Sequence, residues 1–211
     1  MTTFSLDRRA LLVTGLGTLA LGACSGLIGP PEPGPLYVLK PPTGAPGGGP
    51  RLGWQLSIVL PEAPDSLDTD RIALVQPSNR MDYYANSSWQ DRVPFLVQSA
   101  LVEAFESNGR LPAVGRDTEG LKSDYLLETD IRDFQAHYDV EDGIPTAQVR
   151  IAARLIAAHG HAVVQSMIAH AGTAATANSV PAVVEAFDRA LGETLSQIVE
   201  WALGAPTPAR G

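Results

Sequence analysis

The sequence predicts an α/β fold of the α+β type: a two-layer sandwich in which a mixed, mostly antiparallel sheet is covered by two amphipathic helices. Three observations lead to this class. Strand and helix candidates follow one another in the order strands, helix, strands, helix. The strand candidates alternate apolar and polar residues, and both helix candidates carry a single apolar stripe. With 211 residues, of which 45% are hydrophobic, the chain can form the core of one such domain.

The first segment, residues 1–23, has the composition of a signal peptide. Arg8 and Arg9 form a short basic region, and residues 10–23 are an uncharged run that is too short to cross a bilayer core of about 30 Å comfortably. Glycines inside this run disfavour the alternative, a buried core helix. Export by the Sec route and by the twin-arginine route both remain open.

The end of this run predicts lipidation. Leu21, Gly22, Ala23 and Cys24 resemble the lipobox of bacterial lipoproteins. In that family a diacylglyceryl group is attached to the cysteine sulfur, signal peptidase cleaves before the cysteine, and the new amine is acylated. We therefore expect the peptidase to recognise Leu21, Gly22 and Ala23, and Cys24, the single cysteine, to be lipidated rather than free and buried. Ser25 favours the outer membrane over the inner one.

Residues 24–35 are expected to form a lipidated tether, because they are rich in proline and glycine. The folded domain is predicted over 36–203. Its first strand candidate is 36–40, followed by a proline- and glycine-rich loop that has no Lys-Ser/Thr pair for binding phosphate. Further strands are predicted over 54–61, 71–76 and 80–87, with a turn at 77–79 joining the last two.

Residues 91–108 predict the first helix, with Asp91 as its cap, Pro94 in its first turn and Gly109 at its end. Its apolar stripe consists of Val93, Val97, Ala100, Leu101, Ala104 and Phe105. A short strand over 112–116 is expected next.

Three long strand candidates follow at 124–131, 146–158 and 163–171. The polar face of the first is acidic, with Glu128 and Asp130, whereas that of the second carries Arg150 and Arg154. These two strands are therefore expected to be antiparallel neighbours. The stretch around Gly160 predicts a tight turn between the second and third strands.

The second helix is predicted over 179–204, with Ser179 as its cap, Pro181 in its first turn and Gly204 at its end. Its apolar stripe consists of Val184, Phe187, Leu191, Leu195, Ile198 and Ala202. The final segment, 204–211, is expected to be a disordered tail.

Charge and motifs argue against several classes of function. The formal net charge of −8 disfavours nucleic acid as a partner. No G-x-S-x-G elbow is present. His159 and His161 flank a glycine, and we interpret them as turn residues rather than metal ligands, since histidine tolerates positive φ better than most residues. We therefore expect no enzyme, no catalytic residue, no metal and no cofactor other than acyl chains on Cys24.

An aromatic cluster at 83–89 is the candidate partner-binding patch, because aromatic residues are enriched in interfaces. Its members are Tyr83, Tyr84 and Trp89. The alternative is that they seal the ends of the strand and helix. We favour a core position for Trp89 and leave both alternatives open for the tyrosines.

The chain resembles the ABC-type transport auxiliary lipoprotein family, which includes the PqiC lipoprotein, over roughly residues 36–203. The resemblance rests on "LYVLKPP" at 36–42, on the stretch 71–109, on "DYLLETDIRDF" at 124–134, and on the hairpin at 154–171 followed by an amphipathic helix. None of these is a catalytic signature.

The resemblance implies a periplasm-facing auxiliary subunit of an MCE-type ABC system that moves phospholipid or other hydrophobic cargo. Its partners would be an MCE-domain protein, the ABC permease and ATPase, and the membrane through the acyl anchor, in the inner leaflet of the outer membrane. The resemblance also allows a homo-oligomer. The alternative function is an outer-membrane assembly or structural lipoprotein that partners a β-barrel.

Overall fold

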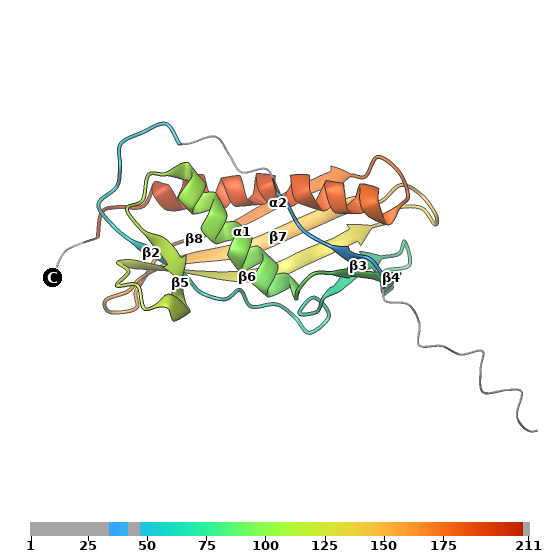
Figure 1. The fold of residues 1–211 in the computed structure, drawn as a ribbon, viewed down its shortest axis with the longest axis horizontal. Coiled ribbons are helices and arrows are strands. Elements are labelled where there is room, and N and C mark those ends of the chain that lie inside the picture. Colours follow the sequence, from blue (N-terminus) through green and yellow to red (C-terminus); the bar gives the residue numbers. More distant parts are fainter. Residues whose placement is uncertain (1–33, 42–46, 209–211) are drawn as a thin grey trace, which may run out of the picture. The chain divides into compact units, whose positions relative to one another are not determined.

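The computed structural model describes residues 34–41 and 47–208, and it confirms the predicted fold class. One sheet of eight strands packs against two α-helices (Figure 1). In chain order the elements are β1 (Leu36–Tyr37), β2 (Leu56–Ile58), β3 (Arg71–Val75), β4 (Met81–Trp89), α1 (Val93–Asn108), β5 (Val114–Arg116), a short 3₁₀ turn η1 (Asp117–Glu119), β6 (Tyr125–His137), β7 (Thr146–Ala157), β8 (Val163–Ala174) and α2 (Val180–Leu203).

β6 organises the sheet. One of its edges pairs along its whole length with β7, which in turn pairs with β8, and both pairings are antiparallel. Its other edge is divided between two short parallel partners: β2 lies beside Tyr125–Leu127, and β3 lies beside Ala136 and His137. β5 extends the sheet beyond β2, while β4 and then β1 extend it beyond β3. The long pairings are thus antiparallel and most of the short ones are parallel.

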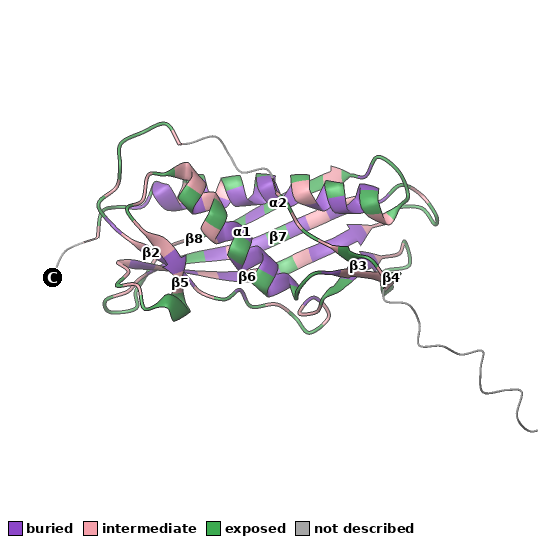
Figure 2. Cartoon of the chain, in the orientation of Figure 1, coloured by how far each residue is buried: buried purple, intermediate pink, exposed green. Residues whose placement is uncertain are grey.

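The predicted charge complementarity between β6 and β7 is confirmed. Glu128 stands opposite Arg154 in the register, and their side chains approach to 3.5 Å. Asp133 stands opposite Arg150, with 2.5 Å between the charged groups. The apolar residues between these polar ones point to the other face and are buried (Figure 2). Alternation with a period of two therefore fixes which face of the sheet is covered.

The predicted turn between β7 and β8 is also confirmed. Gly160 has φ +81°, and His161 has φ +50°. The Ala157 amide donates to the Ala162 carbonyl at 2.9 Å and closes the turn. His161 therefore has a backbone role at this position.

α1 begins one residue later than the sequence suggested. The N-cap is Arg92 rather than Asp91, and Asp91 Oδ1 instead accepts the Arg92 amide at 2.7 Å. The Val93 amide donates to the Thr69 carbonyl at 3.1 Å, so backbone from the preceding loop does the capping. Gly109, with φ +72°, ends the helix as predicted.

α2 contributes the largest share of the helical side of the core. Its predicted stripe is buried in full, and the helix buries several further small residues against β7 and β8. Ser179 is the N-cap, although its side chain makes no capping hydrogen bond. Phe187 stacks on Phe134 with ring centroids 4.9 Å apart, and Trp89 meets Phe187 edge-on at 5.4 Å. This aromatic cluster joins α2, β6 and β4.

Candidate functional site

The lipidation residues Leu21, Gly22, Ala23 and Cys24 lie outside the described residues, so lipidation stays a prediction. Within residues 34–41 and 47–208, no group of three or more His, Cys, Asp or Glu side chains could hold a metal ion. No helix in that part of the chain is long and apolar enough to cross a membrane.

Trp89 belongs to the core and not to the candidate partner-binding patch. Its side chain is 1% exposed, and its ring contacts Phe134 and Phe187. This is the position that the sequence favoured for it. A folded domain does not offer this ring to a partner, so the aromatic patch reduces to its two tyrosines.

Tyr83 is half-buried and holds the loop before β3. Its hydroxyl donates to the Ser66 carbonyl at 3.0 Å. The Arg71 guanidinium lies over its ring, 3.6 Å from the centroid, which is cation–π geometry. Because both its ring and its hydroxyl already have partners, Tyr83 has a structural explanation that does not require another protein.

Tyr84 takes part in a polar chain that sequence reasoning missed. Its hydroxyl lies 2.8 Å from the Tyr138 hydroxyl, which also lies 2.8 Å from Asn178 Oδ1. The Asn178 amide nitrogen donates to the Asp142 carbonyl at 3.1 Å. The chain links β4 to the loop after β6 and to the loop before α2. No local pattern signals it, because its members come from three separate parts of the sequence.

Burial raises the pKa of Tyr84 far above the usual value for tyrosine, and the hydrogen bond with Tyr138 raises it further. Tyr84 therefore stays protonated at any physiological pH. Its hydroxyl joins β4 to the loop after β6 through a hydrogen bond.

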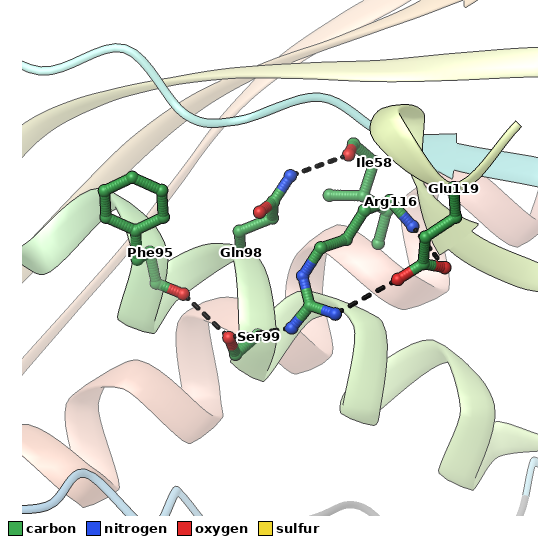
Figure 3. Close-up of polar contacts among 6 residues, drawn as sticks. All are labelled: Ile58, Phe95, Gln98, Ser99, Arg116 and Glu119. Carbon is green, nitrogen blue, oxygen red and sulfur yellow. Dashed lines mark hydrogen bonds and ion pairs between the residues drawn. The ribbon is translucent and has the colours of Figure 1, made fainter. Parts of the chain in front are cut away.

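A second polar cluster fixes α1 to the short strands (Figure 3). The buried Gln98 amide nitrogen donates to the Ile58 carbonyl of β2 at 3.0 Å. Arg116, at the end of β5, donates to Ser99 Oγ at 3.1 Å and pairs with Glu119 at 3.2 Å. Since β2 and β5 are only three residues long each, these side-chain contacts supplement a short backbone ladder.

A groove lies beside α1, where Phe95 and Ser99 face Leu39 of the segment after β1. Its volume is about 440 Å³. The Phe95 ring is 37% exposed, and the Arg92 guanidinium lies 5.6 Å from its centroid. The groove offers an aromatic edge and polar side chains.

A larger groove, of about 850 Å³, lies at the end of the sheet that carries the β7–β8 turn. Gln55, Asp124 and His159 line it together with the first residues of the segment 204–211. The Tyr125 hydroxyl donates to the Pro206 carbonyl at 2.9 Å, so this part of the segment lies against the domain. Burial, assisted by the nearby Asp124 carboxylate, raises the pKa of Tyr125.

Neither helix of the described part of the chain covers the outer face of β6, β7 and β8. This face presents the ion pairs Glu128–Arg154 and Asp133–Arg150, together with the exposed Ile168. Ion pairs this exposed contribute only about 0–1 kcal/mol each to stability. Their value lies in the register they favour and in the polar surface they give this face.

The fold defines an α+β two-layer domain, and comparison with known proteins gives its family. The family model for the ABC-type transport auxiliary lipoprotein component matches residues 37–199, and the chain belongs to this family.

Individual relatives agree with this assignment. The uncharacterized protein bll6063 of Bradyrhizobium diazoefficiens is 28% identical over 165 residues, which are 78% of this chain and 44% of that protein. The chain thus spans less than half the length of this curated relative. The crystal structure of XCC0632 from Xanthomonas campestris, of the DUF330 family, is 26% identical, with a TM-score of 0.74 over 80% of this chain and 94% of that one. Another uncharacterized protein shares the fold at 14% identity, with a TM-score of 0.64 over 81% of this chain and 99% of that one.

Proposed function

We propose that this protein is a non-enzymatic docking subunit of an MCE-type ABC lipid transport system. Acyl chains on Cys24 would hold it in the inner leaflet of the outer membrane, with the domain facing the periplasm. Its partners would be the MCE-domain protein and, through it, the permease and ATPase. The observation that carries the proposal is the family match over residues 37–199 of a chain that has a lipobox-like sequence before it.

The arrangement of the described residues supports a docking role. Tyr84 and Gln98 hold strands, loops and α1 together through hydrogen bonds. The grooves beside α1 and near His159 combine apolar and polar side chains. A protein that organises contacts needs surfaces of this kind.

The partner is tested by mild crosslinking in intact cells, followed by purification of the lipoprotein. Recovery of an MCE-domain protein supports the proposal. Recovery of an outer-membrane β-barrel instead favours the assembly lipoprotein. Failure to recover the MCE-domain protein, while a known lipoprotein complex in the same cells is recovered, contradicts the proposal.

The anchor is tested with Cys24→Ala, which removes the only thiol of the chain. We expect the variant to lose acylation and to leave the membrane fraction, while its circular dichroism spectrum stays that of the wild-type domain. Ser25→Ala is the matched control, because it changes the neighbouring residue and leaves the thiol. If Cys24→Ala fractionates with membranes as tightly as Ser25→Ala, the anchor proposal is wrong.

A further inference from the structure

Three loops gather at one end of the sheet, which we call the tether end: the turn 76–80, the loop 138–145 and the loop 175–179 (Figure 1). Direct bonds hold them together. The Tyr138 amide donates to the Val75 carbonyl at 2.9 Å, and the Ala175 amide donates to the Pro145 carbonyl at 2.9 Å. The Asn178 side chain adds a bond to the Asp142 carbonyl. The tether end is thus one connected surface.

The described chain begins beside β4 and, traced backward from Leu36, leads toward this end. β1 runs parallel to β4, with Leu36 beside Ser88. β4 itself starts at the tether end, at Met81, so the residues before Leu36 lead back in that direction. Gly34 lies so close to β4 that a Cβ on it would come within 2.0 Å of the Asn86 carbonyl oxygen. Cys24 precedes Gly34 by ten residues. An extended chain of ten residues spans at most about 35 Å.

The tether end also carries exposed apolar side chains. Val140 is 68% exposed and Ile144 60%, and Met81, at the start of β4, is 37% exposed. Val140 and Ile144 occupy the same loop, whereas Leu36 lies beside Ser88, toward the other end of β4. Exposed apolar residues that stand alone need no explanation, but this concentration beside the tether indicates an apolar contact surface.

The charges at this end select the kind of surface that it can contact. Asp139, Glu141 and Asp142 surround Val140, and Arg80 is already paired with Asp82 at 3.3 Å. An anionic lipid surface would repel this acidic loop. A zwitterionic headgroup layer would not, and it accepts apolar side chains at its boundary with the acyl chains.

We propose that the tether end rests on a zwitterionic phospholipid surface, with Val140 and Ile144 inserted at the level of the headgroups. The inference rests on the proposed function, because it requires the acyl anchor on Cys24. Contact by the loop orients the domain, with β6, β7 and β8 leading away from the membrane and the β7–β8 turn at the far end.

The experiment uses the full acylated protein in phosphatidylcholine vesicles, with a single NBD fluorophore on Val140→Cys or on Val163→Cys. The sulfur of Cys24 is blocked by its lipid, so the introduced cysteine is the only free thiol. Val163 is the matched control: it is 57% exposed, and it lies at the start of β8, at the opposite end of the sheet. We expect a blue shift, and quenching by doxyl-labelled lipid, for the label at 140 and neither for the label at 163.

Equal quenching of the two labels, or stronger quenching at 163, overturns the inference. Protection of the label at 140 only after an MCE-domain protein is added also overturns it, because the end would then bind protein. Added phosphatidylglycerol should reduce the quenching at 140, and an increase would contradict the charge argument. Flotation of the same vesicles separates the two failures: a protein that does not float refutes the anchor, whereas one that floats with the label at 140 in water refutes only this orientation.

Discussion

Phe187→Ala tests whether α2 and the sheet form one core. Phe187 is 0% exposed, it stacks on Phe134 at 4.9 Å, and Trp89 meets it edge-on at 5.4 Å. Truncating a buried phenylalanine costs about 3–5 kcal/mol, and each aromatic pair lost adds about 0.5–1.5 kcal/mol. Alanine favours the helix by about 0.5 kcal/mol over phenylalanine and offsets a little of this. We expect the free energy of unfolding to fall by about 3.5–7.5 kcal/mol.

Urea unfolding in a Cys24→Ala background, followed by tryptophan fluorescence, measures this loss because Trp89 reports on the same cluster. Phe95→Ala is the matched control: it is the same substitution in the other helix, at a side chain that is 37% exposed. It should cost no more than about 1 kcal/mol. If Phe187→Ala costs as little as Phe95→Ala, the aromatic cluster does not form and the proposed packing of α2 is wrong.

Two further predictions concern buried polar groups. Gln98→Leu should lower the free energy of unfolding by about 1–3 kcal/mol in the same urea assay, because it leaves the Ile58 carbonyl without its donor, and an unchanged midpoint would contradict the bond. Burial raises the pKa of Asp188, more than its hydrogen bond from the Lys40 amide lowers it. The folded state then binds a proton more tightly than the unfolded state, so stability should fall as pH rises above about 4. Asp188→Asn should remove the part of this decline that comes from Asp188. If the free energy of unfolding of the variant falls with pH as steeply as that of the wild type, the raised pKa of Asp188 is contradicted.

The elements with a strong local period were predictable from the sequence. Glu128 and Arg154 alternate with buried residues, so both the face and the antiparallel neighbour followed from the pattern. Gly160 and His161 marked the turn through their tolerance of positive φ. The stripe of α2 identified the helix that covers this hairpin. In each case, residues close in sequence held enough information.

Pairings between distant short segments were not predictable in the same way. Nothing local in "LSI" at 56–58 indicates that it lies between β5 and β6, or that β3 uses the remaining part of the same edge. Gln98 looked like one more helix residue until the structure placed it against β2. The link from Tyr84 to Tyr138 and Asn178 has the same origin, since tertiary packing brings β4 and two loops together. The lipidation site remains a prediction from motif alone.

The long strands have a consequence for docking. β6 has 13 residues, and at about 3.3 Å per residue it spans roughly 40 Å between its ends. The tether end lies at one end of β6, where Val75 pairs with His137, and the groove near His159 lies at the other. If the tether end rests on lipid as proposed, the groove stands about 40 Å from that surface. The acyl anchor alone would not fix this distance, because it leaves the orientation of the domain free. A flexible linker would let the domain tumble about its anchor, whereas a second contact at Val140 and Ile144 holds the rigid sheet upright. A partner arriving from the opposite membrane would then meet an oriented surface. Because the domain has already lost part of its rotational freedom at the membrane, binding the partner would cost less orientational entropy.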